Sequence, residues 1–530
     1  MCVGCDVRRL GAMTSCVNVC KRVHQIEVEL LKETDKVEHS LLLIKGRLQP
    51  ICASAQQLKA TLTLRKTEQE QLTQLSAASE FKLLFDLSKE DSKSESSSES
   101  EPAVNCELQL RCCSGQRQLQ FSYQPRRSAY RVQPLYLVCQ NNEKEKDDHE
   151  QEAKQRCALI DLNLRLVQCI YAHKLSAAGY RNRTFTLNGA CCVFRSQLSC
   201  QEARKCSEDE LWQRFASEIL ASSAWGQQLQ LKFVAFVGCT WYNGAAVAAS
   251  GDYSYTNIRR HLHAHAALGG GGLALFGSGH FYAWPQRFAD IGDCIRSTER
   301  VDVTRLPDES NYRRTYGGVY ASTLGAVCHE LGHCFDLGHT LEGVMGHGFD
   351  YLNRVLTVDQ PTEHLPQRMV STPAAEATIS PPRPRFTQLK IKQPASSKFL
   401  DNYHTQRRND SFYFAHNCAL ILAQHRWLQP DLQANTSAAP EIQLLPANKE
   451  IVSSVPLRLI ELRCNRNSLA AHYEEFKPES ATYRFQLPDS LWHLLATQRT
   501  HYVFVLTIEG DTKRLAFDET PAGVEAEPAQ

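Results

Sequence analysis

The chain has 530 residues, of which 42% are hydrophobic and 22% are charged, and its formal net charge at pH 7 is +1. This composition is ordinary for a soluble protein with a large core, and the length predicts roughly two to four domains. The near-zero charge disfavours nucleic acid or an anionic membrane as a partner, and no run approaches the roughly 18 apolar residues of a membrane span. We therefore expect neither a nucleic-acid nor a membrane partner.

The 21 cysteines do not form a regular disulfide framework. Their number is odd, some are adjacent (Cys112 and Cys113), and others lie within apolar segments (Cys139 and Cys239). The N-terminal residues 1–20 are a weak hydrophobic region for a signal peptide, because Thr, Ser and Asn interrupt them. The sequence favours reduced cysteines in a cytoplasmic or nuclear protein over an oxidised, secreted one. It does not indicate an oligomeric state.

Residues 1–24 are expected to form a flexible tail. The spacings Cys2/Cys5 and Cys16/Cys20 resemble those of small zinc sites, but no structured segment surrounds them. We therefore favour a flexible tail over an N-terminal metal site.

Residues 25–134 have the alternation of apolar and polar residues that predicts β-strands, so we expect a β-rich N-terminal region. Residues 88–103 interrupt it and are almost entirely Ser, Glu, Lys and Asp. Such a segment cannot bury enough apolar surface to offset the entropy of ordering, which predicts a disordered insert.

Strand and helix patterns alternate through the next part of the chain. Residues 158–175 are apolar on all sides of a helix and predict a largely buried one, and residues 207–210 begin the next helix with a capping-box pattern. Residues 228–240 are apolar enough for a central strand that is buried on both faces. The alternation predicts an α/β (α+β) fold with a mixed sheet flanked by helices.

One cluster of histidines indicates metal chemistry. His329 and His333 are four residues apart, so on a helix they lie on one face and can bind one ion, and His339 can join them if the helix ends and the chain turns back. Glu330 is poorly placed to be a ligand but well placed to reach a metal-bound water as a general base. A lone histidine is usually packed or solvated. With only 19 histidines in the chain, however, three at these offsets around a glutamate are hard to attribute to chance.

This array resembles the metzincin signature, H-E-x-x-H-x-x-G-x-x-H followed by a Met-turn, with Met345 at the turn. One position of the sequence differs from this signature: Asp336 is found where the metzincin family has glycine. Aspartate visits the left-handed conformation more readily than most residues, and we expect its carboxylate to accept a hydrogen bond from the following turn. More narrowly, residues 265–276 and 346–350 resemble a group of zinc metallopeptidases of fungi and animals.

The narrower resemblance covers residues 135–428 and implies a metzincin-like catalytic domain over residues 135–430, with a mixed twisted sheet and an active-site helix. It also implies that an edge strand of the sheet binds an extended peptide. We expect this edge at Leu273, Ala274 and Leu275, because the preceding glycines leave the backbone open to another chain. A phosphate-binding loop is the rival interpretation of the glycines, but it lacks the motif that begins a helix.

Further side chains near the motif are candidates for roles in the site. His347 or Tyr351 could stabilise an oxyanion or contact substrate, as a tyrosine near the Met-turn does in some metzincins. His261, His263 and His265 alternate, but no acidic or cysteine partner is near them in sequence, so we expect structural or solvent-facing roles.

The C-terminal part contains a Pro-rich loop at residues 359–398 and, at residues 411–428, a helix that completes the catalytic domain. Three strand-like runs then predict a small β-rich domain at residues 445–511. Residues 512–530 are expected to form a disordered tail.

Two functions follow from these patterns. The first is a zinc metalloendopeptidase with one zinc per chain, bound by His329, His333 and His339, and with a peptide or protein substrate. The second is a zinc-containing scaffold or binding protein that has lost turnover. Asp336 in place of glycine favours the second, whereas an intact Glu330 argues against it.

Overall fold

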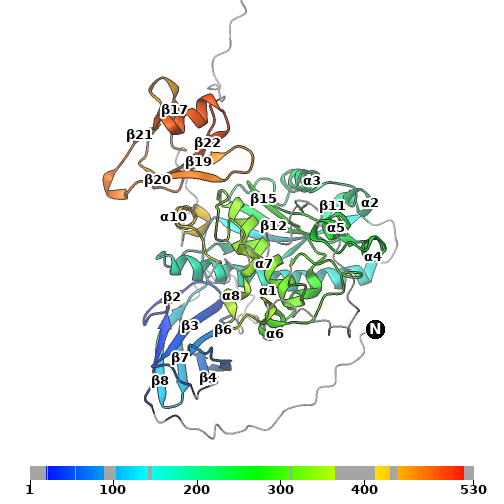
Figure 1. Ribbon diagram of the computed structural model, residues 1–530, viewed down its shortest axis with the longest axis vertical. Helices are drawn as coiled ribbons and strands as arrows, with labels where there is room; N and C mark the ends of the chain where they lie inside the picture. The colour runs from blue at the N-terminus through cyan, green and yellow to red at the C-terminus, as the bar shows by residue number, and fades with distance from the viewer. Residues whose placement is uncertain are drawn as a thin grey trace, which may run out of the picture. The chain divides into compact units, whose positions relative to one another are not determined.

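The computed structural model of the protein divides into two compact units (Figure 1). The first comprises residues 1–37 and 42–124, and the second comprises residues 38–41 and 125–530. The structure describes residues 20, 22–53, 55, 57–88, 103–140, 146–310, 313–363, 412–429 and 439–517. Most of the expected N-terminal tail, the acidic insert, the Pro-rich loop and the last residues lie outside these ranges.

The first unit is built from two β-sheets. One has the strand order β1 (Gln25–Glu29), β3 (Leu41–Gln49), β6 (Glu80–Asp86). The other has the order β2 (Lys36–Val37), β8 (Gly115–Tyr123), β7 (Val104–Cys112), β4 (Gln57–Leu64), β5 (Thr67–Gln74). The β-rich region expected at residues 25–134 thus corresponds to this unit up to residue 124.

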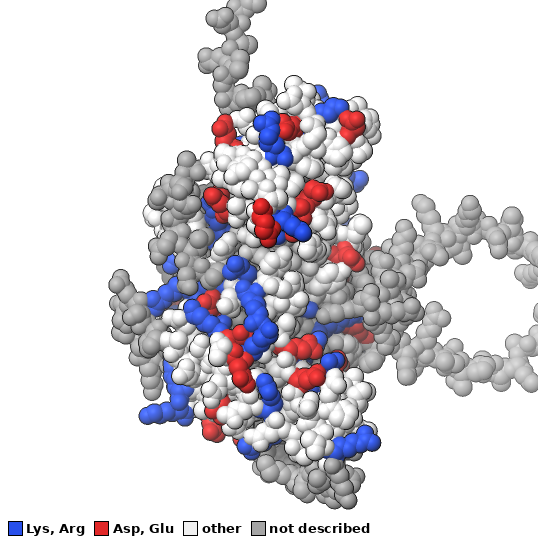
Figure 2. Space-filling view, turned by 90° about the vertical axis from the view of Figure 1, so that its left-hand side faces the viewer, with Lys and Arg blue, Asp and Glu red and all other residues white. Residues whose placement is uncertain are grey.

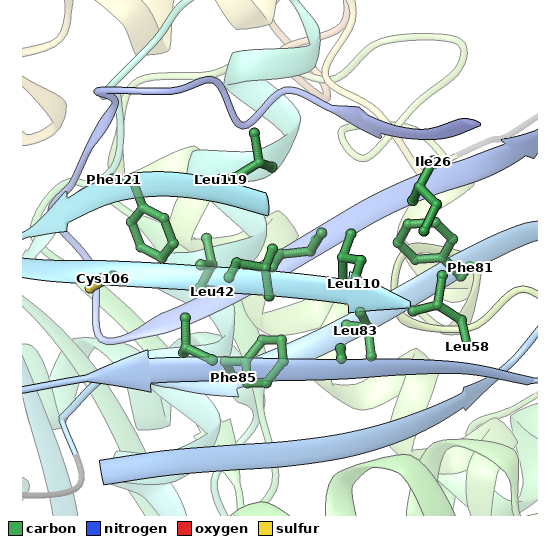
Figure 3. Close-up of a cluster of buried hydrophobic side chains, with 14 of the residues drawn as sticks. Ile26, Leu42, Leu58, Phe81, Leu83, Phe85, Cys106, Leu110, Leu119 and Phe121 are labelled. Atoms are coloured by element: carbon green, nitrogen blue, oxygen red, sulfur yellow. The ribbon is translucent and has the colours of Figure 1, made fainter. Parts of the chain in front are cut away.

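The core of the first unit follows from the alternation of its strands. In β3, β4, β6, β7 and β8, side chains that point to one face are apolar and buried, and they meet in a single cluster (Figure 3). Leu58, Phe81 and Phe85 are fully buried in it, with Ile26 and Phe121 nearly so. Burial of a phenylalanine or leucine side chain contributes roughly 1.5–3 kcal/mol, so this cluster supplies the unit with a core of its own.

The second unit contains the mixed sheet that the sequence predicts. Its strand order is β10 (Thr186–Leu187), β9 (Arg131–Gln140), β12 (Leu231–Val237), β16 (Leu273–Gly277), β15 (Ala267–Gly270), and β11 (Cys192–Ser199) also pairs with β9. These pairings are parallel except that of β15 with β16. Every residue of β12 is buried, as expected for a central strand. The expected α/β class is confirmed.

Helices cover both faces of this sheet. Phe233 of β12 packs in one cluster with Phe215 of α3 (Glu208–Ala221), whereas Phe236 points to the other face and packs on Trp284. Helix α7 (Tyr316–Cys334) contacts β15, β16 and the long helix α1 (Lys146–Ala177). The capping box of α3 is formed as its sequence predicts: Ser207 Oγ accepts from the backbone N–H of Glu210, and the Ser207 N–H donates to the Glu210 carboxylate.

The C-terminal part of the second unit is β-rich. One sheet has the order β17 (Ile442–Leu445), β18 (Glu450–Ser453), β21 (Arg484–Gln486), and the other has β20 (Ala470–Glu475), β19 (Leu457–Cys464), β22 (His501–Thr507), β23 (Thr512–Leu515). Strand β23 lies in the range 512–530 that we expected to be a disordered tail. That expectation is wrong at its start, because β23 pairs with β22.

The surface carries charges of both signs. On the face shown in Figure 2, Lys and Arg side chains are interspersed with Asp and Glu, in line with the net charge of +1. Among the described residues, no helix is long and apolar enough to cross a membrane.

Candidate metal centre

Helix α7 carries the first two histidines and is fixed by buried hydrogen bonds. Thr315 caps its N-terminus, because the Thr315 side chain accepts the N–H of Gly318 at 3.0 Å. The hydroxyl of Tyr171 from α1 donates to the carbonyl of Cys328 at 2.6 Å. This bond holds the residue next to His329 against the core, so the helix presents His329 and His333 from one face.

The helix ends at the residues that turn the chain towards His339. The N–H of Leu337 donates to Gly332 O, and the N–H of Asp336 donates to His333 O, both at 3.1 Å. Asp336 has a φ of 63°, so it takes the left-handed position of a Schellman motif that glycine usually occupies. The chain thus reverses directly after His333.

The carboxylate of Asp336 is held differently from our expectation. It accepts a hydrogen bond from Thr512 Oγ1 at 2.8 Å and lies 3.4 Å from His425 Nε2, rather than bonding to the following turn. Burial is the largest single influence and opposes ionisation. The hydrogen bonds from His425 and Thr512 and the nearby charges of His425 and Lys232 together outweigh it and hold the pKa of Asp336 well below its ordinary value. The left-handed turn is therefore anchored by two distant segments.

His339 is positioned by the loop between β19 and β20. Its N–H donates to Ser468 O at 3.1 Å, and its carbonyl accepts the N–H of Ala470 at 2.9 Å. Its Nδ1 is hydrogen-bonded to Asn467 O. The C-terminal β-rich part thus supplies the support for the third histidine, which no local sequence pattern indicates.

The three imidazoles converge through their Nε2 atoms. His333 Nε2 lies 3.1 Å from His329 Nε2 and 3.2 Å from His339 Nε2. A tetrahedral zinc ion with Zn–N bonds of about 2.05 Å has ligand nitrogens roughly 3.3 Å apart. The spacing of the side chains therefore fits one zinc ion.

The Nδ1 atom of each of the three histidines is hydrogen-bonded to a backbone carbonyl oxygen. His329 Nδ1 donates to Val344 O at 2.7 Å and His333 Nδ1 to Leu337 O at 2.9 Å, alongside the bond of His339 to Asn467. A proton on Nδ1 leaves the Nε2 lone pair free for a metal. Burial lowers the pKa of His329 to about 3 and that of His333 to about 4, so both remain neutral near pH 7.

Glu330 lies between the helix and the sheet edge. Its Oε2 accepts the N–H of Gly269 in β15 at 2.8 Å, and burial raises the pKa of the carboxyl to about 8. A Cβ on Gly269 would lie 2.0 Å from Glu330 O, so the close approach of strand and helix requires glycine at this position. Glu330 is thus oriented by the backbone of the edge strand.

Two open cavities of about 710 and 680 Å³ flank this centre and share Ala267, Glu330, His339 and Asn467 in their walls. The first also runs along the backbone of residues 267–271. A groove therefore passes the three histidines with β15 as one wall.

The edge strand differs from the one that we expected. Leu273, Ala274 and Leu275 lie on β16, which pairs with β12 on one side and β15 on the other, and their side chains are buried. They cannot offer a free edge to a peptide, so that expectation is wrong. The edge is β15, where the N–H of Gly269 points away from β16 to Glu330.

The residues after His339 occupy different environments. Met345 is buried, packs against Gly332 of α7 and lines the second cavity. His347 is exposed and lines the same cavity. Tyr351 lines neither cavity; it is buried beneath Arg354, whose guanidinium carbon lies 4.2 Å from the ring centroid. The structure thus places His347, but not Tyr351, beside the groove.

A second histidine cluster lies near the groove and escaped the sequence patterns. His265 Nε2 and His280 Nε2 lie 3.3 and 3.4 Å from the carboxylate of Glu309. The Arg259 guanidinium also pairs with Glu309 and lies 2.7 Å from His265 Nε2. This fixed positive group next to the donors disfavours a metal ion here, so we interpret the cluster as a buried ion-pair network. Glu309 is 44 residues from His265 and 29 from His280 in the sequence, so no local spacing connects the carboxylate to the two histidines.

His261 and His263 lie outside this network. His261 Nδ1 is hydrogen-bonded to Asn257 O at 2.9 Å, and the His263 ring stacks on Trp241. Neither lines the two cavities.

The chain is similar to known proteins in sequence. Residues 25–425 match the model of a family described as "Putative peptidase family". A Saccharomyces cerevisiae protein named "Putative zinc metalloproteinase" is 36% identical over 97 residues, which cover 18% of this chain and 14% of the yeast protein. No solved structure matches the chain significantly.

Proposed function

The chain belongs to the family described as "Putative peptidase family", and from this premise we propose its function. We propose that this protein hydrolyses internal peptide bonds with zinc, through a metzincin-like arrangement of His329, His333, His339 and Glu330. The observation that carries this proposal is the convergence of three Nε2 atoms at 3.1 and 3.2 Å beside a buried carboxylate.

The three histidines would hold the zinc, with their Nδ1 atoms fixed by carbonyls. Bound there, zinc supplies a Lewis acid for the scissile carbonyl and lowers the pKa of water. Three protein ligands leave the fourth tetrahedral position open, which is typical of a catalytic site rather than a structural one. Met345 forms an apolar floor against α7.

Glu330 is the proposed general base. Its carboxylate takes a proton from the attacking water and returns it to the nitrogen of the leaving amine. The Gly269 N–H holds Oε2 in place, and burial brings its pKa close to neutral, which suits a group that must both accept and release a proton.

The proposed substrate is an extended polypeptide. Strand β15 is the edge of the sheet, and a peptide beside it would gain backbone hydrogen bonds of the kind that strands exchange. Because cavities lie on both sides of Glu330 and His339, the chain can continue past the centre in both directions, which favours an endopeptidase. His347 is the proposed side-chain contact on one side.

The second candidate is a scaffold with the same fold and no turnover. Asp336 in place of glycine was the feature that favoured it. Since Asp336 already has a φ of 63° and His339 Nε2 lies 3.2 Å from His333 Nε2, the replacement gives no geometric reason for inactivity. We therefore favour the enzyme.

Purified full-length protein should cleave an unfolded, unmodified protein such as reduced casein. Cleavage should stop with a zinc chelator and return when zinc is restored. Glu330→Gln serves as the matched control for contaminating proteases. Equal cleavage by the native protein and Glu330→Gln would contradict the proposal.

A further inference from the structure

A second group of metal-binding side chains lies in the first unit, outside the peptidase centre. Cys20 and His24 precede β1, Cys52 follows β3, and Cys113 is in the turn between β7 and β8. One donor atom from each lies within 4.8 Å of all the others. The fold thus brings three distant segments of the chain to one point at the end of the two sheets.

Two of the distances between the donors are close to the edges of the tetrahedron around a zinc ion. With Zn–S bonds of about 2.3 Å and Zn–N bonds of about 2.05 Å, the edges of the tetrahedron are roughly 3.8 Å for two sulfurs and roughly 3.5 Å for sulfur and nitrogen. Cys52 Sγ and Cys113 Sγ are 3.9 Å apart, and Cys20 Sγ is 3.2 Å from His24 Nε2. The sulfurs of Cys52 and Cys113 are not joined in a disulfide, since their separation is well beyond the roughly 2.05 Å of an S–S bond.

His24 has the supporting contact that metal-binding histidines usually have. Its Nδ1 lies 2.8 Å from Pro50 O, which places the ring proton there and leaves Nε2 for the metal. This is the same arrangement as in the three histidines of the peptidase centre. The ring is buried, so its orientation is fixed.

The segments that carry the donors are joined by bonds that need no metal. Ser114 Oγ donates to Arg22 O at 2.8 Å, which links the β7–β8 turn to the segment before β1. The N–H of Cys52 donates to Ser79 Oγ at 2.9 Å. The donors are therefore held in place by the surrounding backbone.

The neighbouring cysteine provides an internal contrast. Cys112 is in the hydrophobic core, and its thiol donates to Gln57 O at 3.4 Å. Cys113 follows it in the turn with a φ of 51° and is exposed at the surface. Two adjacent cysteines thus have different environments, and only Cys113 joins the cluster.

We propose that Cys20, His24, Cys52 and Cys113 bind one structural zinc ion. On binding, the three thiols release their protons to solvent and the thiolates and the His24 Nε2 form four bonds to the ion. Four protein ligands leave no position for water or substrate, so this ion stabilises the first unit and takes no part in hydrolysis. The site is independent of the proposed peptidase centre.

The test measures metal in the full-length protein by elemental analysis. Native protein should hold two zinc ions per chain, and both His333→Ala and Cys113→Ser should hold one. Cobalt-substituted His333→Ala should show the near-ultraviolet sulfur-to-cobalt charge-transfer band of a thiolate site. In cobalt-substituted Cys113→Ser, this band should be weaker than in the native protein or absent. If His333→Ala loses a zinc ion but Cys113→Ser does not, the peptidase centre is supported and this second site is overturned. If Cys113→Ser loses a zinc ion but His333→Ala does not, the second site is supported and the three-histidine site is overturned.

Two further variants separate metal binding from folding. Cys112→Ala, the matched control, should keep both ions. Cys113→His should also keep both ions, because histidine tolerates the left-handed backbone and ligates zinc, but its charge-transfer band should weaken since two thiolates replace three. A native Cys52–Cys113 disulfide, found by mass spectrometry without reduction, would overturn the proposal. So would two zinc ions in folded Cys113→Ser with no sulfur-to-cobalt band in the native protein.

Discussion

His339 Nδ1 is hydrogen-bonded to the main-chain oxygen of Asn467, a residue 128 positions further along the chain. The contact joins the proposed third ligand to the loop between β19 and β20. Because the backbone of Ser468 and of Ala470, on either side of Leu469, also bonds to His339, the histidine forms a parallel β-bridge with this loop. The C-terminal β-rich part is thus a component of the candidate metal centre.

The first prediction tests this contact through Gly338. A Cβ at this position would lie 2.5 Å from Ser468 O and 2.9 Å from Arg463 Nε, so Gly338→Ala should push the supporting loop away from His339. Loss of an outer contact of a ligand typically weakens metal binding about 10- to 100-fold, and we expect a decrease of this size in zinc affinity by chelator competition. Gly292→Ala, where a Cβ meets only Arg296 at 3.8 Å, is the control. Native affinity in Gly338→Ala would show that the loop does not position His339.

The second prediction concerns the ligand set. His333→Ala should lose one zinc ion and all peptidase activity, because His333 Nε2 is the atom that lies near both other imidazoles. Zinc content by elemental analysis and cleavage of unfolded protein are the measurements. An unchanged zinc content would exclude the three-histidine site.

The third prediction separates the base from the ligands. Glu330→Gln keeps an oxygen that can accept the Gly269 N–H, so the fold and the zinc content should be those of the native protein. Turnover should decrease at least about 100-fold, since general-base catalysis contributes 10²–10⁴-fold. If turnover persists, another group activates the water.

The fourth prediction concerns the turn at Asp336. Asp336→Gly should keep zinc because glycine accepts the φ of 63°, but loss of the hydrogen bonds to Thr512 and His425 should lower the free energy of unfolding by about 1–2 kcal/mol. Asp336→Val should weaken zinc binding, since a β-branched residue fits the left-handed conformation poorly. Asp336→Asn, which tolerates this conformation and can still accept from Thr512, is the control. Native zinc affinity in the valine variant would contradict this account.

The fifth prediction concerns the pH dependence of zinc binding. A fall in pH releases zinc only as the ligand imidazoles become protonated, and the pKa of His329 is about 3 and that of His333 about 4. At pH 5, a ligand with the usual pKa of 6.5 would weaken the apparent affinity roughly 30-fold, whereas these two should contribute almost nothing. Protonation of His329 or His333 should therefore not release zinc at pH 5. Protonation of either imidazole between pH 7 and 5, followed by nuclear magnetic resonance in the zinc-free protein, would contradict the low pKa values.

Local patterns predicted the parts of this structure that depend on local geometry. The four-residue spacing of His329 and His333 places both on one face of α7, and the apolar run at residues 228–240 contains the central strand β12. The apolar run at residues 273–276 is likewise a strand. Its position inside the sheet, however, depends on pairing with β15, whose glycines have low strand propensity.

Contacts between distant segments could not be predicted in this way. The sequence drew attention to the spacing of Cys16 and Cys20, whereas the cluster joins Cys20 to Cys52 and Cys113 through the pairing of separate strands. The Asp336 carboxylate likewise finds its partner at Thr512. Such contacts are fixed by the register of sheets, which a single sequence does not display.

The dependence of His339 on residues 467–470 also affects when the candidate centre can form during synthesis of the chain. At roughly 5–20 residues per second, a ribosome adds the 128 residues that separate His339 from Asn467 in roughly 6–26 s. During this interval the nascent chain already contains α7 with Glu330 and the first two histidines, but not the loop that orients the third. A growing chain would therefore carry an incomplete candidate centre beside its own unfolded segments, and the proposed cleavage of polypeptides would become possible only after those segments had been made and folded.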